Sequence, residues 1–136
     1  MTRGSKSVSL AGLFAALADT TRLRLLNLMA GREVCVCHFV EILGQSQSKI
    51  SRHLAYLRQA GIVAARREGK WMHYSICVPA DAAAKSILSA TLAALDNNRQ
   101  MRADRRKLDR ACCAPQELVT PPGAPRPALL APLPES

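Results

Sequence analysis

The 136-residue sequence lacks any long apolar run. No window reaches the roughly 18 uninterrupted apolar residues that a membrane-spanning helix needs. The first ten residues, MTRGSKSVSL, lack the apolar block and cleavage site of a signal peptide. Internal repeats are also absent. We therefore expect a cytoplasmic protein with no membrane partner, and a chain in which 49% of residues are hydrophobic is long enough for one domain with a core.

Acidic residues are scarce. The sequence has 10 Asp and Glu against 19 Lys and Arg, a formal net charge of +9. Such an excess favours a polyanionic partner, because each neutralised phosphate releases condensed counterions. Between Gln45 and Ser75, six basic residues accompany the single acidic Glu68, so this block carries over half of the excess charge. Nucleic acid is the first candidate partner; an acidic membrane surface, the second candidate, is not the partner that we expect.

Cysteine is infrequent and odd in number, at five residues. Cys35 and Cys37 are separated by one residue, Cys77 stands alone, and Cys112 and Cys113 are adjacent. A disulfide framework does not have this pattern. In a reducing compartment, such thiols are expected to serve as ligands or as redox groups.

Apolar residues at helical spacing dominate the first part of the chain. The segment Leu10–Met29 reads as two helices that meet at a corner, because Asp19 is a good N-cap residue in its middle. A short third helix is predicted over Phe39–Leu43, ending at Gly44. These helices precede the basic block.

The basic block begins with a fourth predicted helix, from the N-cap Ser46 to about Ala60, which Gly61 ends. The next segment, Ile62–Cys77, has two extended runs around Gly69, the pattern of a β-hairpin. This order of elements predicts a mainly α-helical winged helix-turn-helix: a helix, a glycine turn, a capped polar helix and a hairpin that forms the wing.

A last long helix is predicted to open at Pro79 and Asp81, with an apolar stripe that reaches Leu95 and thins into arginines after Asn97. From Pro115 onward the sequence is rich in proline, and we assign it no structure. The predicted organisation is a flexible N-terminus (1–9), a winged helix-turn-helix domain (10–111) and a flexible tail that carries the Cys pair (112–136).

The fourth helix displays short polar donors and an arginine opposite its apolar stripe, which suits the major groove of DNA. The basic residues near the hairpin tip are expected to meet the phosphate backbone or the minor groove. The alternative for the basic residues between Gln45 and Ser75 is a solvated face that binds no partner. His53 could contact DNA or border the core equally well. The predicted DNA contacts are Ser46, Gln47, Ser48, Lys49, Ser51, Arg52, His53, Arg66, Arg67 and Lys70.

Three segments resemble the ArsR/SmtB family of winged-helix metalloregulatory repressors, in particular its arsenical-sensing members: ALADTTRLRLLNLM, EVCVCHFVEIL and QSQSKISRHLAYLRQAGIVAARREGKWMHYSI. The resemblance implies a homodimer built on the first and last long helices, which binds an inverted-repeat operator and releases it when an effector binds. Cys35 and Cys37 match the family's thiols at the start of the helix before the recognition helix. The nearest members have a third cysteine where this chain has Val40.

Thiolates are soft ligands and favour thiophilic ions such as trivalent arsenic or antimony, Cd, Pb or Hg. Residues two apart in a regular helix point about 200° away from each other. Both sulfurs therefore reach one ion only if the helix start unwinds, since residues i and i+2 share a face in an extended chain. Cys35 and Cys37 are the predicted ligands of As(III), with Sb(III) or methylarsenite as alternatives, and no organic cofactor is expected.

The third ligand is open at this stage. Cys112 or Cys113, from the same protomer or its partner, is the natural candidate, and a two-thiol site would suit an organoarsenical. The alternative for Cys35 and Cys37 is a pair of small buried residues without a ligand. No histidine follows Tyr74, so the carboxylate-and-His zinc site of the family's zinc sensors is not available.

Two other functions remain as alternatives. The first is a winged-helix repressor that senses Cd, Pb or thiol oxidation. The second is a thiol-dependent reductase, which needs a lowered thiol pKa and a substrate pocket. The winged helix-turn-helix leaves little of the chain for such a pocket, so we predict a regulator rather than an enzyme.

Overall fold

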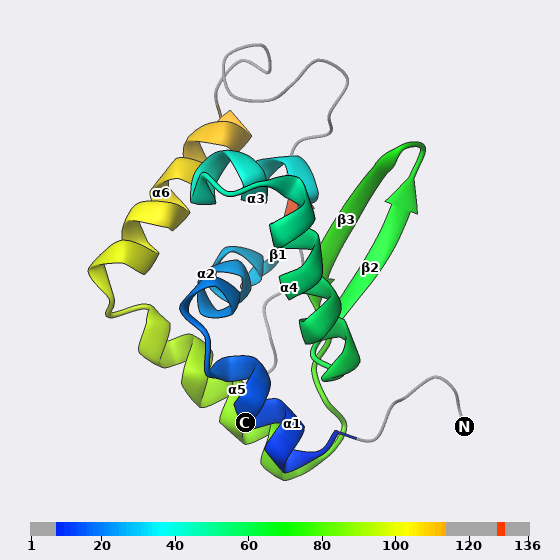
Figure 1. Ribbon diagram of the computed structural model, residues 1–136. Coiled ribbons are helices and arrows are strands. Elements are labelled where there is room, and N and C mark those ends of the chain that lie inside the picture. The colour runs from blue at the N-terminus through cyan, green and yellow to red at the C-terminus, as the bar shows by residue number, and fades with distance from the viewer. Residues whose placement is uncertain (1–7, 114–127, 130–136) are drawn as a thin grey trace.

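A computed structural model describes residues 8–113 and 128–129, with only the backbone described for Cys112, Cys113, Ala128 and Leu129 (Figure 1). None of the helices in these residues is both long and apolar enough to cross a membrane. The elements are α1 (Leu10–Leu17), α2 (Thr20–Met29), β1 (Arg32–Cys35), α3 (Val36–Leu43), α4 (Gln47–Gln59), β2 (Val63–Glu68), β3 (Trp71–Ile76), α5 (Ala82–Leu95), α6 (Arg99–Cys113) and β4 (Ala128–Leu129).

The predicted helix boundaries at the corner and at the turn are confirmed by their caps. The side chain of Asp19 accepts a hydrogen bond from the Arg22 backbone N–H at 3.0 Å. The hydroxyl of Ser46 accepts one from the Lys49 backbone N–H at 3.3 Å. Gly44 ends α3 with a φ of 67°, a left-handed conformation that suits glycine. The helices α3 and α4 therefore form the helix-turn-helix that the sequence predicts.

The wing is a two-stranded antiparallel hairpin that projects beside α4 (Figure 1). The sheet also contains β1, which the sequence did not predict, in the order β2-β3-β1-β4. Val34 pairs with Tyr74 and Cys35 pairs with His73, so the hairpin is joined to the strand that leads into α3. Part of the tail, to which we assigned no structure, forms β4 and pairs with β1.

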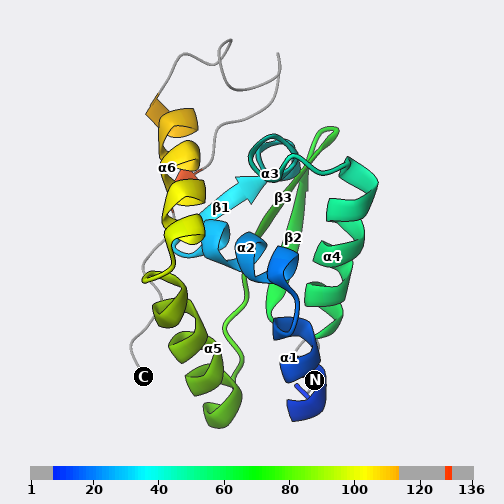
Figure 2. The ribbon, with the colours of Figure 1, turned by 60° about the vertical axis from the view of Figure 1, so that its left-hand side comes forward.

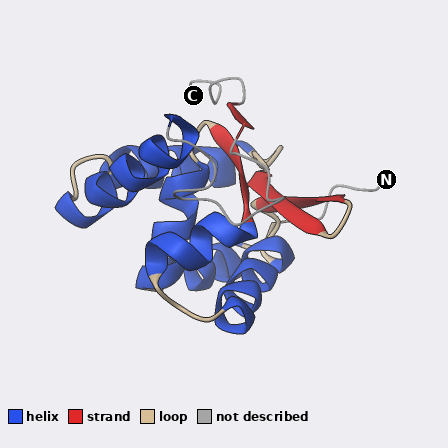
Figure 3. Cartoon of the chain, turned by 90° about the horizontal axis from the view of Figure 1, so that it is seen from above, coloured by secondary structure: helices blue, strands red, loops and turns tan. Residues whose placement is uncertain are grey.

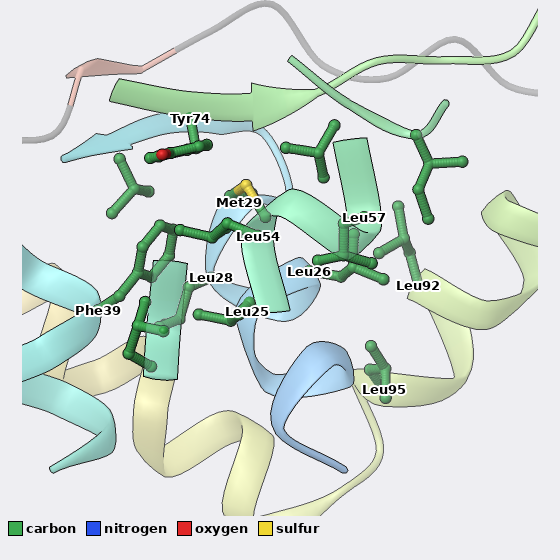
Figure 4. Packing of buried hydrophobic residues seen from close by; sticks show 14 of the residues in the cluster. Leu25, Leu26, Leu28, Met29, Phe39, Leu54, Leu57, Tyr74, Leu92 and Leu95 are labelled. Carbon is green, nitrogen blue, oxygen red and sulfur yellow. The ribbon is translucent and has the colours of Figure 1, made fainter. Parts of the chain in front are cut away.

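The core fills the space between the helices and the inner face of the sheet. The strands gather on one side of the molecule and the helices on the other (Figure 3). Phe39 and Tyr74 meet across this boundary with their ring centroids 6.4 Å apart (Figure 4). Leu54 and Leu57 are fully buried, so α4 rests on the core with its polar face outward.

The last long helix differs from the prediction. Two helices are present, because α5 ends at Leu95 and α6 begins at Arg99 after a turn. The second helix packs against α2 and α3 and buries Met101 and Leu108 (Figure 2). The arginine-rich segment after Asn97, predicted as the weakening end of one long helix, is therefore a separate helix that packs on the domain.

Candidate thiol site and nucleic-acid interface

The two thiols lie where β1 becomes α3. Cys35 is the last residue of β1 and also the N-cap of α3, with extended backbone angles (φ −74°, ψ 144°). Cys37 lies in the first helical turn, and its Sγ is 3.3 Å from the Sγ of Cys35. The expectation that the helix start must unwind is wrong, because α3 begins after Cys35 and the two sulfurs already converge.

The short contact between the sulfurs makes the two thiols unequal. The Cys37 thiol donates a hydrogen bond to the Cys35 sulfur, which lowers the pKa of Cys35 to about 7. The same contact, together with burial, raises the pKa of Cys37. Near neutral pH, Cys35 therefore carries substantial thiolate character while Cys37 holds its proton. A thiolate of this kind is the form that binds soft ions.

A buried histidine borders the pair. Nδ1 of His38 lies 3.7 Å from the Sγ of Cys37, and His38 is 2% exposed. Burial, assisted by the charge of His73, lowers the pKa of His38 to about 4, so its imidazole is neutral near pH 7. Within the described part of the chain, no three His, Cys, Asp or Glu side chains are grouped to hold a metal ion. Cys35, Cys37 and His38, which could in principle have bound zinc together, are therefore not grouped to hold a metal ion.

The predicted third ligand falls on side chains outside the described ones, those of Cys112 and Cys113. The helix that carries them is described, and it packs against α3. Near its end, the carboxylate of Asp109 pairs with the guanidinium of Arg32 at 2.8 Å. Because Arg32 begins the strand that ends in Cys35, this ion pair joins the last turns of α6 to the start of that strand.

Three residues, Gly44, Gln45 and Ser46, separate the helix of the thiols from α4. The amide of Gln45 donates a hydrogen bond to the Thr21 hydroxyl at 3.2 Å, which ties this turn to the start of α2. The helices α3 and α4 also pack directly on each other. A displacement of α3 therefore has a short path to α4.

The solvent face of α4 carries the predicted nucleic-acid contacts. Its apolar stripe faces the core, and Ile50 at its centre is fully buried. On the opposite side, Ser51 is half-buried, and the other predicted residues at the start of the helix are exposed: Ser46, Gln47, Ser48, Lys49 and Arg52. Together they present hydroxyl, amide and cationic donors on one surface.

His53, by contrast, is engaged within the protein. Its Nδ1 lies 3.3 Å from Nη1 of Arg22 and 3.9 Å from Oδ1 of Asp19. Arg22 also donates to the carbonyls of Ala15 and Ala16, and its guanidinium stacks 4.1 Å from the ring centre of Tyr56. Of the two alternatives for His53, these contacts favour the one in which it borders the core and links α4 to the corner of α1 and α2.

The wing cations differ among themselves. Arg66 donates to both carboxylate oxygens of Glu33 on β1, at 2.9 and 2.7 Å, and also pairs with Glu68. Arg67 and Lys70 are exposed, and Lys70 Nζ lies 5.7 Å from the centre of the Trp71 ring. The partnership between Glu33 and Arg66 was not predictable, because it depends on the unpredicted pairing of β1 with β3.

A winged helix-turn-helix, with α4 as its exposed polar helix, defines the class of a DNA-binding transcriptional regulator. A family model described as "Bacterial regulatory protein, arsR family" matches residues 19–65. Among solved structures, HlyU from Vibrio cholerae N16961 superposes with a TM-score of 0.52 at 30% identity, over 59% of this chain and 84% of that one. A solution structure of Mb0332 from Mycobacterium bovis, described as a homodimeric winged helix-turn-helix DNA-binding domain, gives 0.53 at 29% identity, over 66% and 81%.

Curated relatives agree with this family. The arsenical resistance operon repressor of Escherichia coli K12 is 50% identical over 74 residues, which is 52% of this chain and 63% of the relative. The arsenic resistance transcriptional regulator ArsR1 of Pseudomonas putida is 51% identical over 65 residues, 47% of this chain and 51% of the relative. A probable mercury resistance operon repressor of Streptomyces lividans is 41% identical over 87 residues, 64% and 68%. The chain belongs to the ArsR family of bacterial regulatory proteins.

Proposed function

We propose that the protein is a homodimeric, DNA-binding repressor of an arsenic-resistance operon that leaves its operator when trivalent arsenic binds Cys35 and Cys37. The matched region spans 63% and 51% of the E. coli and P. putida relatives, whose names concern arsenic. The observation that carries the proposal is the 3.3 Å contact between the two sulfurs at the entrance of α3. Its proposed place of action is the cytoplasm, where operator DNA lies.

Binding of arsenous acid follows from the chemistry of these two thiols. Each As–S bond forms as one hydroxyl group leaves arsenic as water, with the proton of the thiol or, where the thiol is already ionised, with a proton from solvent. Cys35, with its lowered pKa, is the stronger nucleophile and attacks first. Cys37 then supplies the second sulfur from its adjacent position. The same exchange applies to Sb(III) and to methylarsenite, which has one fewer hydroxyl group to lose.

Cys112 or Cys113 is the proposed third ligand, in cis. The ion pair between Arg32 and Asp109 supports this assignment, because it holds the last turns of α6 near β1. Three sulfurs would complete the coordination of As(III), whereas two suffice for methylarsenite. If this third ligand is used, release of DNA by arsenite requires Cys112 or Cys113. Release by methylarsenite does not require either of them.

The proposed operator contacts are made by the exposed start of α4 in the major groove and by the wing on the backbone. Lys49 and Arg52 supply cations on α4, and Arg67 and Lys70 supply them on the wing. A two-fold symmetric dimer presents two such surfaces, which explains why the operator should be an inverted repeat.

The proposed dimer interface uses α1 and α5, which lie at the same end of the molecule (Figures 1 and 2). Leu10 and Phe14 on α1 are 51% and 54% exposed, although both are large and apolar. The solvent side of α5 carries small residues, among them Ala83, Ala90 and Ala94. Apolar side chains exposed to water at one end of a molecule are typical of a surface that a second copy covers.

Coupling from the thiols to the operator proceeds through α3. Cys37 lies in the first turn of α3, so bonds from Cys35 and Cys37 to one ion act directly on this helix, and only Gly44, Gln45 and Ser46 separate it from α4. A ligand that favours the altered state by about 3 kcal/mol shifts the DNA-binding population by more than a hundredfold.

A gel-shift titration on inverted-repeat DNA tests the proposal, with arsenite, antimonite, methylarsenite, Cd, Hg and Zn as effectors. Wild type should release DNA on arsenite, and the Cys35→Ser/Cys37→Ser variant should stay bound. The Cys77→Ser variant is the matched control and should respond like wild type, because Cys77 is exposed and remote from the pair in sequence. Release of the Cys35→Ser/Cys37→Ser variant by arsenite contradicts the proposal.

A second candidate effector is another soft ion, such as Hg, Cd or Pb. The S. lividans relative, a probable mercury resistance operon repressor, favours this reading, and two sulfurs alone satisfy the linear coordination of Hg(II). The same titration separates the candidates. Release by Hg at lower concentration than by arsenite, still dependent on Cys35 and Cys37, favours mercury.

A further inference from the structure

Arg66 and Glu33 form an ion pair that joins the wing to β1, the strand that ends in Cys35. The guanidinium of Arg66 donates Nε to Glu33 Oε2 at 2.9 Å and Nη2 to Glu33 Oε1 at 2.7 Å. This is the two-pronged geometry in which an arginine and a carboxylate interact most strongly. The side chain of Glu33 is only 14% exposed, so its carboxylate depends on this partner.

The register of the sheet explains how these residues meet across the intervening strand. His73 on β3 pairs with Cys35 on one side and with Arg66 on the other. Directly opposed residues of antiparallel strands share a face, so these three form one row. Glu33, two residues before Cys35, lies on the same face, and the long Arg66 side chain reaches diagonally to it.

Arg67 lies on the other face of the hairpin, because side chains alternate along a strand. This second face carries Val63 and, across the ladder, Tyr74, both of which are buried in the core. The helices lie on the core side of the sheet (Figure 3), so we infer that β2 contacts α4 on this face. Arg67 is therefore on the side of the recognition helix, whereas Arg66 is on the side that faces away from it.

The charges around Arg66 also argue against a phosphate contact. Its guanidinium is paired with Glu33 and lies 3.4 Å from Glu68, so two carboxylates surround one cation. A phosphate that approached this site would meet a local excess of negative charge. A cation already neutralised in the protein releases few counterions from DNA.

We propose that Glu33 is a positioning residue for the wing: its ion pair with Arg66 fixes the hairpin on β1, so that Arg67 and Lys70, and not Arg66, neutralise operator phosphates. The proposal rests on the proposed DNA binding for its second half only. Its first half, the fixing of the hairpin, concerns the free protein. Trp71, the only tryptophan of the chain, pairs with Glu68 at the hairpin tip and reports on that half directly.

The first experiment measures quenching of Trp71 fluorescence in the free protein by acrylamide, a neutral quencher that does not respond to the charge changes in the variants. Glu33→Gln and Arg66→Gln should raise quenching to the same extent, and the double variant should raise it no further, because both changes break one interaction. Arg66→Lys keeps the charge but loses the fork and should behave like Arg66→Gln. Arg67→Gln is the matched control and should leave quenching unchanged. Unchanged quenching in Glu33→Gln overturns the proposal.

The second experiment measures operator affinity against salt concentration. Arg67→Gln removes one phosphate contact per protomer and should flatten the slope of log K against log salt by about 1.8 for the dimer. Arg66→Gln should leave the slope unchanged while affinity falls several-fold. If Arg66→Gln flattens the slope as much as Arg67→Gln, the proposal is overturned. If wild type binds no DNA, the proposed function fails, and the quenching measurement still decides the role of Glu33.

Discussion

Arg24 on α2 donates two hydrogen bonds to the carboxylate of Asp104 on α6, at 2.7 and 3.0 Å, and Asp104 is completely buried. Gln100 donates a third to the same carboxylate at 2.9 Å. The pKa of Arg24 is raised by its hydrogen bond to Asp104. One turn away, the amide of Asn27 donates to the Met101 carbonyl at 2.9 Å. These bonds fix α6 on α2, and the final turns of α6 are thereby held near β1.

Breaking this buried pair should be costly. Asp104→Asn keeps the volume of the side chain but leaves Arg24 without a charged partner, and should lower the free energy of unfolding by about 3 kcal/mol. Urea denaturation followed by circular dichroism measures the change. Asp109→Asn, which removes the partly exposed partner of Arg32, is the control and should cost less than about 1 kcal/mol. An equal decrease in the free energy of unfolding in the two variants would contradict the prediction that Asp104 contributes more to stability than Asp109.

Cys35 should have a lower pKa than Cys37, and this low pKa should depend on the hydrogen-bond donor at position 37. Cys37→Ala removes the thiol that hydrogen-bonds Cys35, so the pKa of Cys35 should rise from about 7 toward or above its ordinary value of 9.0. Cys37→Ser keeps a donor and should keep the pKa of Cys35 low. Ultraviolet absorbance of the thiolate measures both, in a background where the other cysteines are serine. A low pKa that persists in Cys37→Ala would refute the assigned cause.

The same pKa shift predicts how stability changes with pH. Because the folded-state pKa of Cys35 lies below its unfolded value, the folded state binds fewer protons than the unfolded state between about pH 7 and 9. The contribution of the Cys35 thiolate to the free energy of unfolding is fully present above the pKa that Cys35 has in the unfolded chain. It is lost as the pH falls through about 7. The difference in unfolding free energy between wild type and Cys37→Ala should therefore grow from pH 7 to pH 9, as urea titrations at each pH would measure. A difference that is constant across this interval is the contrary result.

The N-cap of the recognition helix should contribute to stability and to DNA binding together. Ser46→Ala leaves the Lys49 backbone N–H without its acceptor and should cost about 1 kcal/mol in thermal or urea unfolding. Operator affinity should also fall, since the start of α4 carries the proposed base contacts. Gln59→Ala, at an exposed position at the other end of α4, is the control and should change stability by less than about 0.5 kcal/mol. An unchanged stability in Ser46→Ala would show that the cap is unimportant.

A charge on the proposed dimer face should separate the protomers. Phe14→Glu places a carboxylate on the apolar face of α1 and should give a monomer in analytical ultracentrifugation at concentrations where wild type is a dimer. Lys107→Glu, on the exposed side of α6, is the control and should remain dimeric. A dimeric Phe14→Glu variant would move the interface away from α1.

Much of the fold was predictable because its signals are local. Asp19, Ser46 and Gly44 each act on a backbone group within four residues of themselves, so sequence alone locates the ends of α2, α4 and α3. The hairpin around Gly69 is local in the same sense, and the wing followed from it. The thiol pair was found because its spacing is short.

The unpredicted parts depend on contacts between distant segments. The strand β1 has four residues and exists because Val34 and Cys35 pair with a strand almost forty residues later. The helix α6 buries Asp104 at the centre of its inner face, so a charged residue stands where the hydrophobic pattern would need an apolar one. Neither feature has a local signature, and both position the thiol site.

The ladder between β1 and β3 has a thermodynamic consequence for the sensor. Cys35 is held by its pairing with His73 before any effector arrives, and Cys37 follows in a helix already formed. Ordering a residue from a flexible chain costs about 1–2 kcal/mol, a cost that an already ordered binding site largely avoids. More of the free energy of As–S bond formation then appears as net affinity for the effector. A site that is preorganised in this way can respond at lower effector concentrations than the same two thiols would in a flexible segment.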